Sequence, residues 1–225
     1  MKNTAKKSII TGFTFLIAFT IFTPLVQTID LHIAPATGKH IGFSTINIWF
    51  HNFTGVNMYL YDLTDWLSII PLTICLFHGM QGLRQLITRK NIFKVDGHIL
   101  ISGIYYAVII RLFFLFEAFP INYRPILING ICEASYPSST TLLVLTVMPA
   151  FIFKLHRNSS SKIISAAATA FTIFMVIARL ISGVHWLTDI IGGASLSTGL
   201  FYIYKGAILI YDYKQIQSGA NYGIQ

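Results

Sequence analysis

The sequence predicts an all-α membrane protein, built as a bundle of six transmembrane helices. Three observations favour this fold class. Only 11% of the 225 residues are charged and 54% are hydrophobic, whereas a soluble domain is typically about 25% charged. The hydrophobic residues gather in six runs, most of them near the length of about 20 residues that spans a bilayer. The net charge of +8 sits at the ends of these runs, which indicates membrane orientation rather than nucleic-acid binding.

The six runs define the predicted elements in chain order. They cover residues 8–28, 66–83, 99–119, 140–153, 163–181 and 190–210. The first run follows three lysines and precedes no clear cleavage site, so we expect it to remain as an anchor. Residues 41–60 lack a clean apolar run and are expected to be re-entrant or interfacial. We therefore divide the chain into an N-terminal anchor with an outer interfacial segment, residues 1–62, and a helical domain, residues 63–225.

Positive charge is unevenly distributed between the two ends of the predicted helices. One side carries Lys2, Lys6, Lys7, Arg84, Arg89, Lys90, Lys94, Lys154, Arg157, Lys162, Lys205 and Lys214. The other side carries Lys39 and Arg124. Because positive charge marks the cytoplasmic side, both termini are expected inside. Residues 118–139 and 182–189 should then meet on the outer face of a multi-pass protein of the cell membrane.

The stretch from Ala178 to Asp189 carries three side chains suited to an anion. His185 and Asp189 are four residues apart, so on a helix they would share a face. A carboxylate beside an imidazole fixes its tautomer and stabilises its cationic form, leaving the far ring nitrogen free to attack. The guanidinium of Arg179 suits a phosphate. Spacing alone favours equally a plain helix start with one core histidine and one acid in its first turn.

Two further polar stretches are expected on the same face. One runs from Glu117 to Arg124-Pro125. The other, Tyr136-Pro137-Ser138-Ser139-Thr140-Thr141, leads into an apolar run, so Ser138 or Ser139 is expected to cap a helix whose free N–H groups bind phosphate. A capped helix and a solvated arginine would explain these two stretches equally well.

Together the three stretches resemble the type 2 phosphatidic acid phosphatase superfamily. The family pattern is K-x6-R-P, then P-S-G-H, then S-R-x5-H-x3-D. The order of the motifs is the same here, and the resemblance covers roughly residues 99–200. The matching residues are Arg124-Pro125, Pro137-Ser138, Arg179, His185 and Asp189.

The chain departs from the family pattern at three positions. Glu117 replaces the lysine and Ala178 the serine that contact phosphate oxygens in the family, and Thr140 replaces the histidine that protonates the leaving oxygen. Arg111 lies about 9 Å before Glu117 along the predicted helix. It is expected either to pair with Glu117 or to replace part of the missing positive charge.

The resemblance implies a membrane lipid phosphatase that works through a phosphohistidine on His185, with Asp189 holding the imidazole. The implied phosphate-binding residues are Arg124, Arg179, Ser138 and Ser139. Because Thr140 cannot donate a proton as the family histidine does, we favour a substrate whose leaving group needs none. A lipid diphosphate, such as a polyprenyl diphosphate, meets that condition. The alternative is a catalytically silent relative that binds phospholipid headgroups.

The sequence predicts no cofactor, no metal and no nucleic-acid partner. The spacing of His32, His40 and His51 fits no standard set of metal ligands. Cys75 and Cys132 lack CxxC spacing, and a disulfide between them is left open. The identity of the lipid and the oligomeric state are left open as well.

Overall fold

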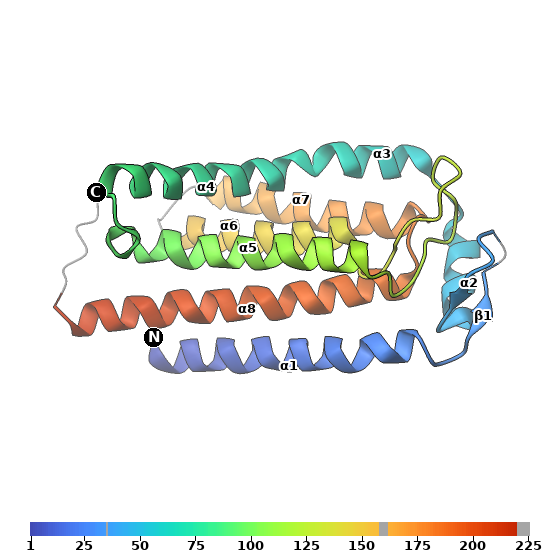
Figure 1. Ribbon diagram of the computed structural model, residues 1–225, viewed down its shortest axis with the longest axis horizontal. Coiled ribbons are helices and arrows are strands. Elements are labelled where there is room, and N and C mark those ends of the chain that lie inside the picture. Colours follow the sequence, from blue (N-terminus) through green and yellow to red (C-terminus); the bar gives the residue numbers. More distant parts are fainter. Residues whose placement is uncertain (35, 158–161, 220–225) are drawn as a thin grey trace.

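The protein is a bundle of long helices that lie side by side, with smaller elements across one end (Figure 1). The computed structural model describes residues 1–34, 36–157 and 162–219. Its helices are α1 (Lys2–Val26), α2 (Ser44–Thr54), α3 (Met58–Leu67), α4 (Ile69–Arg89), α5 (Gly97–Ala118), α6 (Ser139–Arg157), α7 (Lys162–Ile181) and α8 (Leu187–Gln217). A 3-10 turn, η1 (Ile92–Lys94), and two antiparallel strands, β1 (His32–Ile33) and β2 (His40–Ile41), complete the described elements.

Five helical segments among the described residues are long and apolar enough to cross a membrane, and α3 with α4 counts as one of them. The sixth rod, α8, falls outside that group. Its 31 residues correspond to about 46 Å of helix, more than the roughly 30 Å of a bilayer core. It contacts α1, α5, α6 and α7, so it lies within the bundle rather than at its edge. The prediction of an all-α transmembrane bundle is confirmed, although the predicted second run begins at Met58 rather than at residue 66.

Small residues allow α1 to pack closely along α8. A Cβ atom added to Gly199 would lie 2.8 Å from Leu16, and one added to Gly206 would lie 2.5 Å from Ile9. On the facing helix, a Cβ atom on Gly12 would lie 2.8 Å from Ile203. Packing through small residues is characteristic of helix pairs in membranes, where burial of apolar surface gives little driving force. The N-terminal helix therefore shares a packed core with the rest of the chain.

Successive long helices run in opposite directions (Figure 1). The start of α1 and the end of α8 therefore lie at one end of the bundle. The α5–α6 loop, the α7–α8 loop and α2 lie at the opposite end. The two polar segments that were expected to share a face, residues 118–139 and 182–189, do meet there.

Helix α2 is fixed to the start of α8. Asn47 donates to the Thr188 hydroxyl at 3.0 Å and accepts from the Thr188 N–H at 3.2 Å. Ile41 and Ala34 pack on the buried Trp186 ring. The predicted interfacial segment is thus a folded cap over the end of the bundle that carries the polar loops. Cys75 and Cys132 are both free, so the disulfide that was left open does not form.

Candidate active site

The loop that carries His185 is fixed by close backbone contacts. Gly183 has a φ of +69°, and a Cβ atom there would lie 1.9 Å from the Gly55 carbonyl oxygen. Only glycine combines a positive φ with such a close approach at no steric cost. The neighbouring Ser182 carbonyl accepts from the Asn57 N–H at 2.9 Å. The connection between α2 and α3 therefore holds the loop that presents His185.

Ser135 connects His185 to Asp189. The Ser135 Oγ lies 3.0 Å from the His185 Nδ1 and donates a short hydrogen bond to the Asp189 carboxylate. Because that hydroxyl proton goes to the carboxylate, the histidine Nδ1 carries the other proton and donates it to Oγ. The direct Nδ1–Oδ2 distance is 3.7 Å. His185 precedes α8, so the expectation that the two residues share a helix face is wrong, but their side chains do lie next to each other, and Ser135 bridges them.

Asp189 is fully buried and also stabilises the start of α8. Its carboxylate accepts from the Trp186 N–H at 2.8 Å and from the Asn122 side chain at 3.5 Å. An acidic side chain in the first turn satisfies free N–H groups and complements the helix dipole. Asp189 therefore both stabilises the start of α8 and, through Ser135, orients His185.

The α5–α6 loop places Arg124 beside this triad. The Arg124 N–H donates to the Glu133 carbonyl at 3.1 Å and the Ser135 N–H to the Asn122 carbonyl at 2.9 Å, so the loop folds back on itself. The Arg124 Nη2 pairs with the Glu133 carboxylate at 3.0 Å. Its Nε and Nη1 are buried and have no partner in the described part of the chain. Buried donors of this kind are normally satisfied, which indicates that an anion belongs next to Arg124.

Arg179 is anchored from α3. Its Nη1 donates to the Asp65 carboxylate at 2.9 Å and to the Thr64 hydroxyl at 3.0 Å. The Tyr61 ring lies 4.6 Å from the Arg179 guanidinium and 5.4 Å from that of Arg124, so one aromatic face supports both cations. The Nε of Arg179 is buried and lacks a partner among the described residues.

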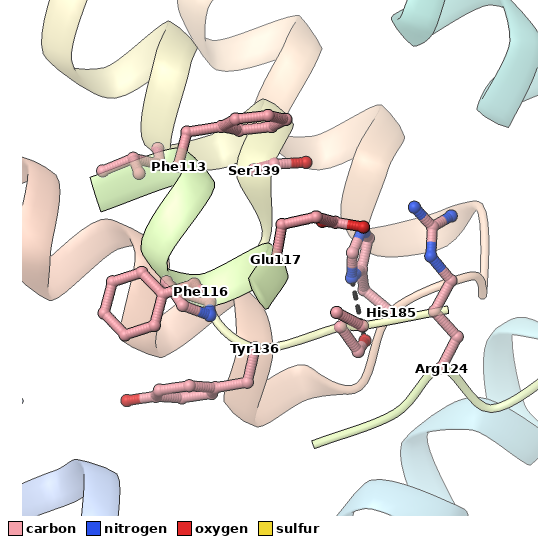
Figure 2. A pocket seen from close by; sticks show the side chains of 11 residues that line it. Phe113, Phe116, Glu117, Arg124, Tyr136, Ser139 and His185 are labelled. Atoms are coloured by element: carbon pink, nitrogen blue, oxygen red, sulfur yellow. Dashed lines mark hydrogen bonds between the residues drawn. The ribbon is translucent and has the colours of Figure 1, made fainter. Parts of the chain in front are cut away.

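A small cavity lies in front of His185 (Figure 2). It has about 20 Å³ of free space, enough for one water molecule. Its lining comprises Phe113, Phe116, Glu117, Arg124, Ala134, Ser135, Tyr136, Pro137, Ser139, Leu142 and His185. The His185 Nε2, which is buried, has no partner among the residues that the structure describes. The site therefore presents an unshared ring nitrogen and unsatisfied guanidinium donors in one region.

The other predicted site residues fall into two groups. Ser139 lines the cavity, whereas Thr140 is buried beside it and is not part of the lining. Ser138 precedes α6 and accepts from the Thr141 N–H at 3.4 Å. Its own N–H donates to the Asp189 carbonyl at 3.1 Å, so it is not free to bind phosphate as expected. Arg111 is exposed on α5 and forms no ion pair with Glu117 in the described structure, contrary to one of the two expectations for it.

The surroundings of His185 keep its imidazole neutral. Burial lowers the pKa of His185 well below 6.5, and the charges of Arg179 and Arg124 lower it further. The ring is thus a neutral base with its Nδ1 proton held by Ser135. A neutral imidazole with a free ring nitrogen, near enough to two guanidinium groups to feel their charge, is suited to nucleophilic attack on an anionic centre.

Sequence reasoning missed Ser135 and Asn122 in the loop before α6, and the group Tyr61, Thr64 and Asp65 on α3. Ser135 lies eleven residues after Arg124, the nearest predicted cation. The two residues come close because the loop folds back and pairs residues 122–124 with residues 133–135, which no periodicity in the sequence indicates. The two acids Asp62 and Asp65 made the start of α3 look unlike a span. Asp65 could have been found from the charges alone. An acidic residue in an apolar helix needs a partner, and Arg179 in another apolar run was a candidate for it.

The fold defines an all-α transmembrane protein, and the residues around His185 form a candidate anion site. The family model of the PAP2 superfamily matches residues 97–210, just over half of the chain, and the chain belongs to that superfamily. Its fold is similar to the crystal structure described as the first transmembrane PAP2 type phosphatidylglycerolphosphate phosphatase from Bacillus subtilis. The TM-score is 0.61 at 18% identity, over 91% of this chain and 96% of the other. Among curated proteins, none matches the sequence significantly.

Proposed function

We propose that the protein is a membrane lipid phosphatase that hydrolyses a lipid phosphate or diphosphate through a phosphohistidine on His185. One observation carries this proposal. The His185 Nε2 is buried without a partner at a cavity shared with Arg124, while its Nδ1 is held by the Ser135–Asp189 pair. Membership of the PAP2 superfamily and the fold of a phosphatidylglycerolphosphate phosphatase support a lipid phosphate as the substrate class.

In the proposed first step, the His185 Nε2 attacks phosphorus while the bond to the leaving oxygen breaks. Phosphoryl transfer depends chiefly on positioning and on stabilising the charge of the equatorial oxygens. The unsatisfied donors of Arg124 and Arg179 are available for those oxygens. Ser139, which lines the cavity at the start of α6, is the remaining candidate from the second motif. Asp189, acting through Ser135, stabilises the imidazole as it becomes cationic.

The position of the cavity supports a substrate that arrives from the bilayer. Phe113 lines the cavity and is also 41% exposed on the surface of α5. The free space of about 20 Å³ holds one water-sized group, so side chains of this wall must move to admit a phosphoryl group. A lipid tail can remain against the exposed aromatic residues of α5 while its headgroup enters.

The chemistry of the leaving group favours a lipid diphosphate, such as a polyprenyl diphosphate, as the substrate. An alkoxide must be protonated as it departs, whereas a departing phosphate is already a weak base. Thr140 cannot supply that proton near neutral pH, and it does not line the cavity. We therefore expect diphosphates to be hydrolysed faster than the corresponding monoesters.

Phosphate release by the purified protein from a matched panel of lipid monophosphates and diphosphates tests the proposal. His185→Ala should abolish release, and Asp189→Asn should reduce it strongly. Normal turnover in His185→Ala would contradict the phosphohistidine. If the wild type binds these lipids and releases no phosphate from any of them, the silent headgroup-binding alternative, which Glu117 and Thr140 favour, is the correct one.

We further propose that the site faces the outside of the cell membrane. The cations at the other end of the bundle support this orientation. In a protein with Cys75 and Cys132 replaced by alanine, a cysteine at the exposed Asn129 should react with an impermeant reagent in intact cells. A cysteine at the exposed Lys94, at the opposite end of the chain's long helices, is the matched control and should react only after permeabilisation. The reverse pattern would overturn the orientation.

A further inference from the structure

We infer that Glu117 is a catalytic residue: it takes the proton from the water that hydrolyses the phosphohistidine. The inference rests on the proposed function and concerns its second step. The positions of the carboxylates around the site lead to it.

Four acidic side chains surround the anion site, and three of them are engaged. Asp189 is bonded to Ser135 and to the Trp186 N–H. Glu133 pairs with Arg124 at 3.0 Å, and Asp65 pairs with Arg179 at 2.9 Å. Glu117 has neither an ion pair nor a side-chain hydrogen bond within the described residues, yet it lines the same cavity as His185. It is therefore the carboxylate that remains available to a ligand in the cavity.

Glu117 also approaches from the side that the reaction requires. Its side chain extends from the end of α5 toward His185 and Arg124 (Figure 2). His185 lines the same cavity from another element, the α7–α8 loop. In an in-line displacement, water attacks phosphorus on the side away from the Nε2–P bond. Because Glu117 enters the cavity from α5 and His185 from the α7–α8 loop, we infer that the Glu117 carboxylate lies beside that water.

Other cavity groups do not meet this requirement. The Tyr136 hydroxyl lies 3.0 Å from the Thr23 hydroxyl, and in Figure 2 it points away from His185. The Ser135 hydroxyl proton is committed to Asp189. Ser139 offers a hydroxyl, which is a poor base.

The water oxygen forms a bond to phosphorus while one water proton moves to the Glu117 carboxylate. The Nε2–P bond breaks, and its electron pair returns to the imidazole of His185. Inorganic phosphate leaves, and Glu117 then releases its proton to solvent. The step is the same for monoester and diphosphate substrates, because both give the same phosphohistidine.

This role makes a distinctive kinetic prediction for Glu117→Gln. General-base catalysis contributes about 10²–10⁴-fold, so kcat should fall roughly 100-fold or more. The first step, with a leaving group that needs no proton, should persist, so kcat/KM should not fall. Farnesyl diphosphate labelled on its β-phosphorus is the probe. The mutant should release a stoichiometric burst of farnesyl phosphate and retain acid-labile label on the protein.

The controls separate this inference from the proposed function. His185→Ala should acquire no label, and Asp62→Asn, which removes an exposed acid outside the cavity, should turn over like the wild type. Glu117→Gln with wild-type turnover, or with slow turnover and no label, would overturn the role of Glu117 alone. Absence of label from Glu117→Gln, together with unaltered hydrolysis by His185→Ala, would overturn the phosphohistidine itself.

Glu117→Lys gives an independent test. If Glu117 only marks the loss of a phosphate-binding cation, a lysine should raise turnover. If Glu117 is the base, the lysine should tighten phosphate binding and lower KM, while kcat falls and label accumulates as in Glu117→Gln. A rise in kcat would refute the inference.

Discussion

Ser135→Ala tests whether the serine bridge orients the nucleophile. The substitution removes the acceptor of the His185 Nδ1–H, at 3.0 Å, and a donor to the Asp189 carboxylate. Both groups are almost completely buried, at 3% and 0% exposure. Neither can turn to bulk water to replace the lost bond.

The expected size of the effect follows from those two bonds. A buried polar group left without its partner costs about 1–3 kcal/mol. If that energy is lost from the transition state, in which the imidazole becomes cationic, the rate falls roughly 5- to 150-fold. The lower figure applies if the side chains close the 3.7 Å gap between Nδ1 and the carboxylate, and the upper figure applies if they do not.

The assay is kcat/KM for phosphate release, measured beside the thermal unfolding of the same preparation. Ser197→Ala is the matched control, because its buried hydroxyl donates to the Leu142 carbonyl at 3.2 Å and does not contact His185. Equal activity in Ser135→Ala and Ser197→Ala, with both proteins folded, would refute the bridge.

Three other outcomes follow from the geometry. Because the pKa of His185 lies below 6.5 in the folded protein, the unfolded chain binds this proton first as pH falls. Unfolding free energy should therefore decrease below pH 6.5 by up to about 1.4 kcal/mol per pH unit, with a smaller slope in His185→Gln melts. Arg179→Ala should lower kcat/KM about 100-fold or more. Arg179→Lys should restore little of this loss, because one ammonium group cannot bind Asp65 and also replace the free Nε. Full restoration by lysine would contradict bidentate binding of the phosphate. Gly183→Ala should lower the melting temperature more than Gly38→Ala. Both glycines have positive φ, but only at position 183 would the added Cβ atom lie 1.9 Å from a carbonyl oxygen; equal shifts would argue against that contact.

The helices were predictable because each is encoded locally. Apolar runs predicted five of the six rods, with boundaries within seven residues of those observed. The exception is the rod formed by α3 and α4. Asp62 and Asp65 interrupt its hydropathy, and a pattern search treats such acids as loop residues. Asp65 is explained by a contact between residues distant in sequence, its ion pair with Arg179 at 2.9 Å.

The site was predictable only where it is local in sequence. Arg179, His185 and Asp189 fall within eleven residues, so their spacing is visible without a structure. The bridge from Ser135 depends on how the α5–α6 loop folds back on itself, which no periodicity encodes. Ser139 and Thr140 show a further limit. They are adjacent in sequence, but successive residues differ by about 100° around a helix, and the lining includes Ser139 rather than Thr140.

The charges around the site determine how it should respond to salt. Two guanidinium groups, Arg124 and Arg179, lie among four acids: Asp65, Glu117, Glu133 and Asp189. Because the acids outnumber the cations, long-range attraction to these groups cannot account for binding of an anion. Binding must instead come from short-range bonds to the unsatisfied donors.

Among these acids, Glu117 is exposed and has no ion-pair partner within the described residues. Its electrostatic repulsion of an anionic substrate therefore acts partly across solvent, where salt can screen it. Salt screens such interactions over about 8–10 Å at physiological ionic strength. Raising ionic strength should therefore increase kcat/KM for a short-chain diphosphate, the reverse of the usual result for an anion-binding site. Because Glu117→Gln removes this repulsion, the same titration should show no rise in that variant. A kcat/KM that falls with salt in both proteins would show that net attraction, and not donor geometry, binds the substrate.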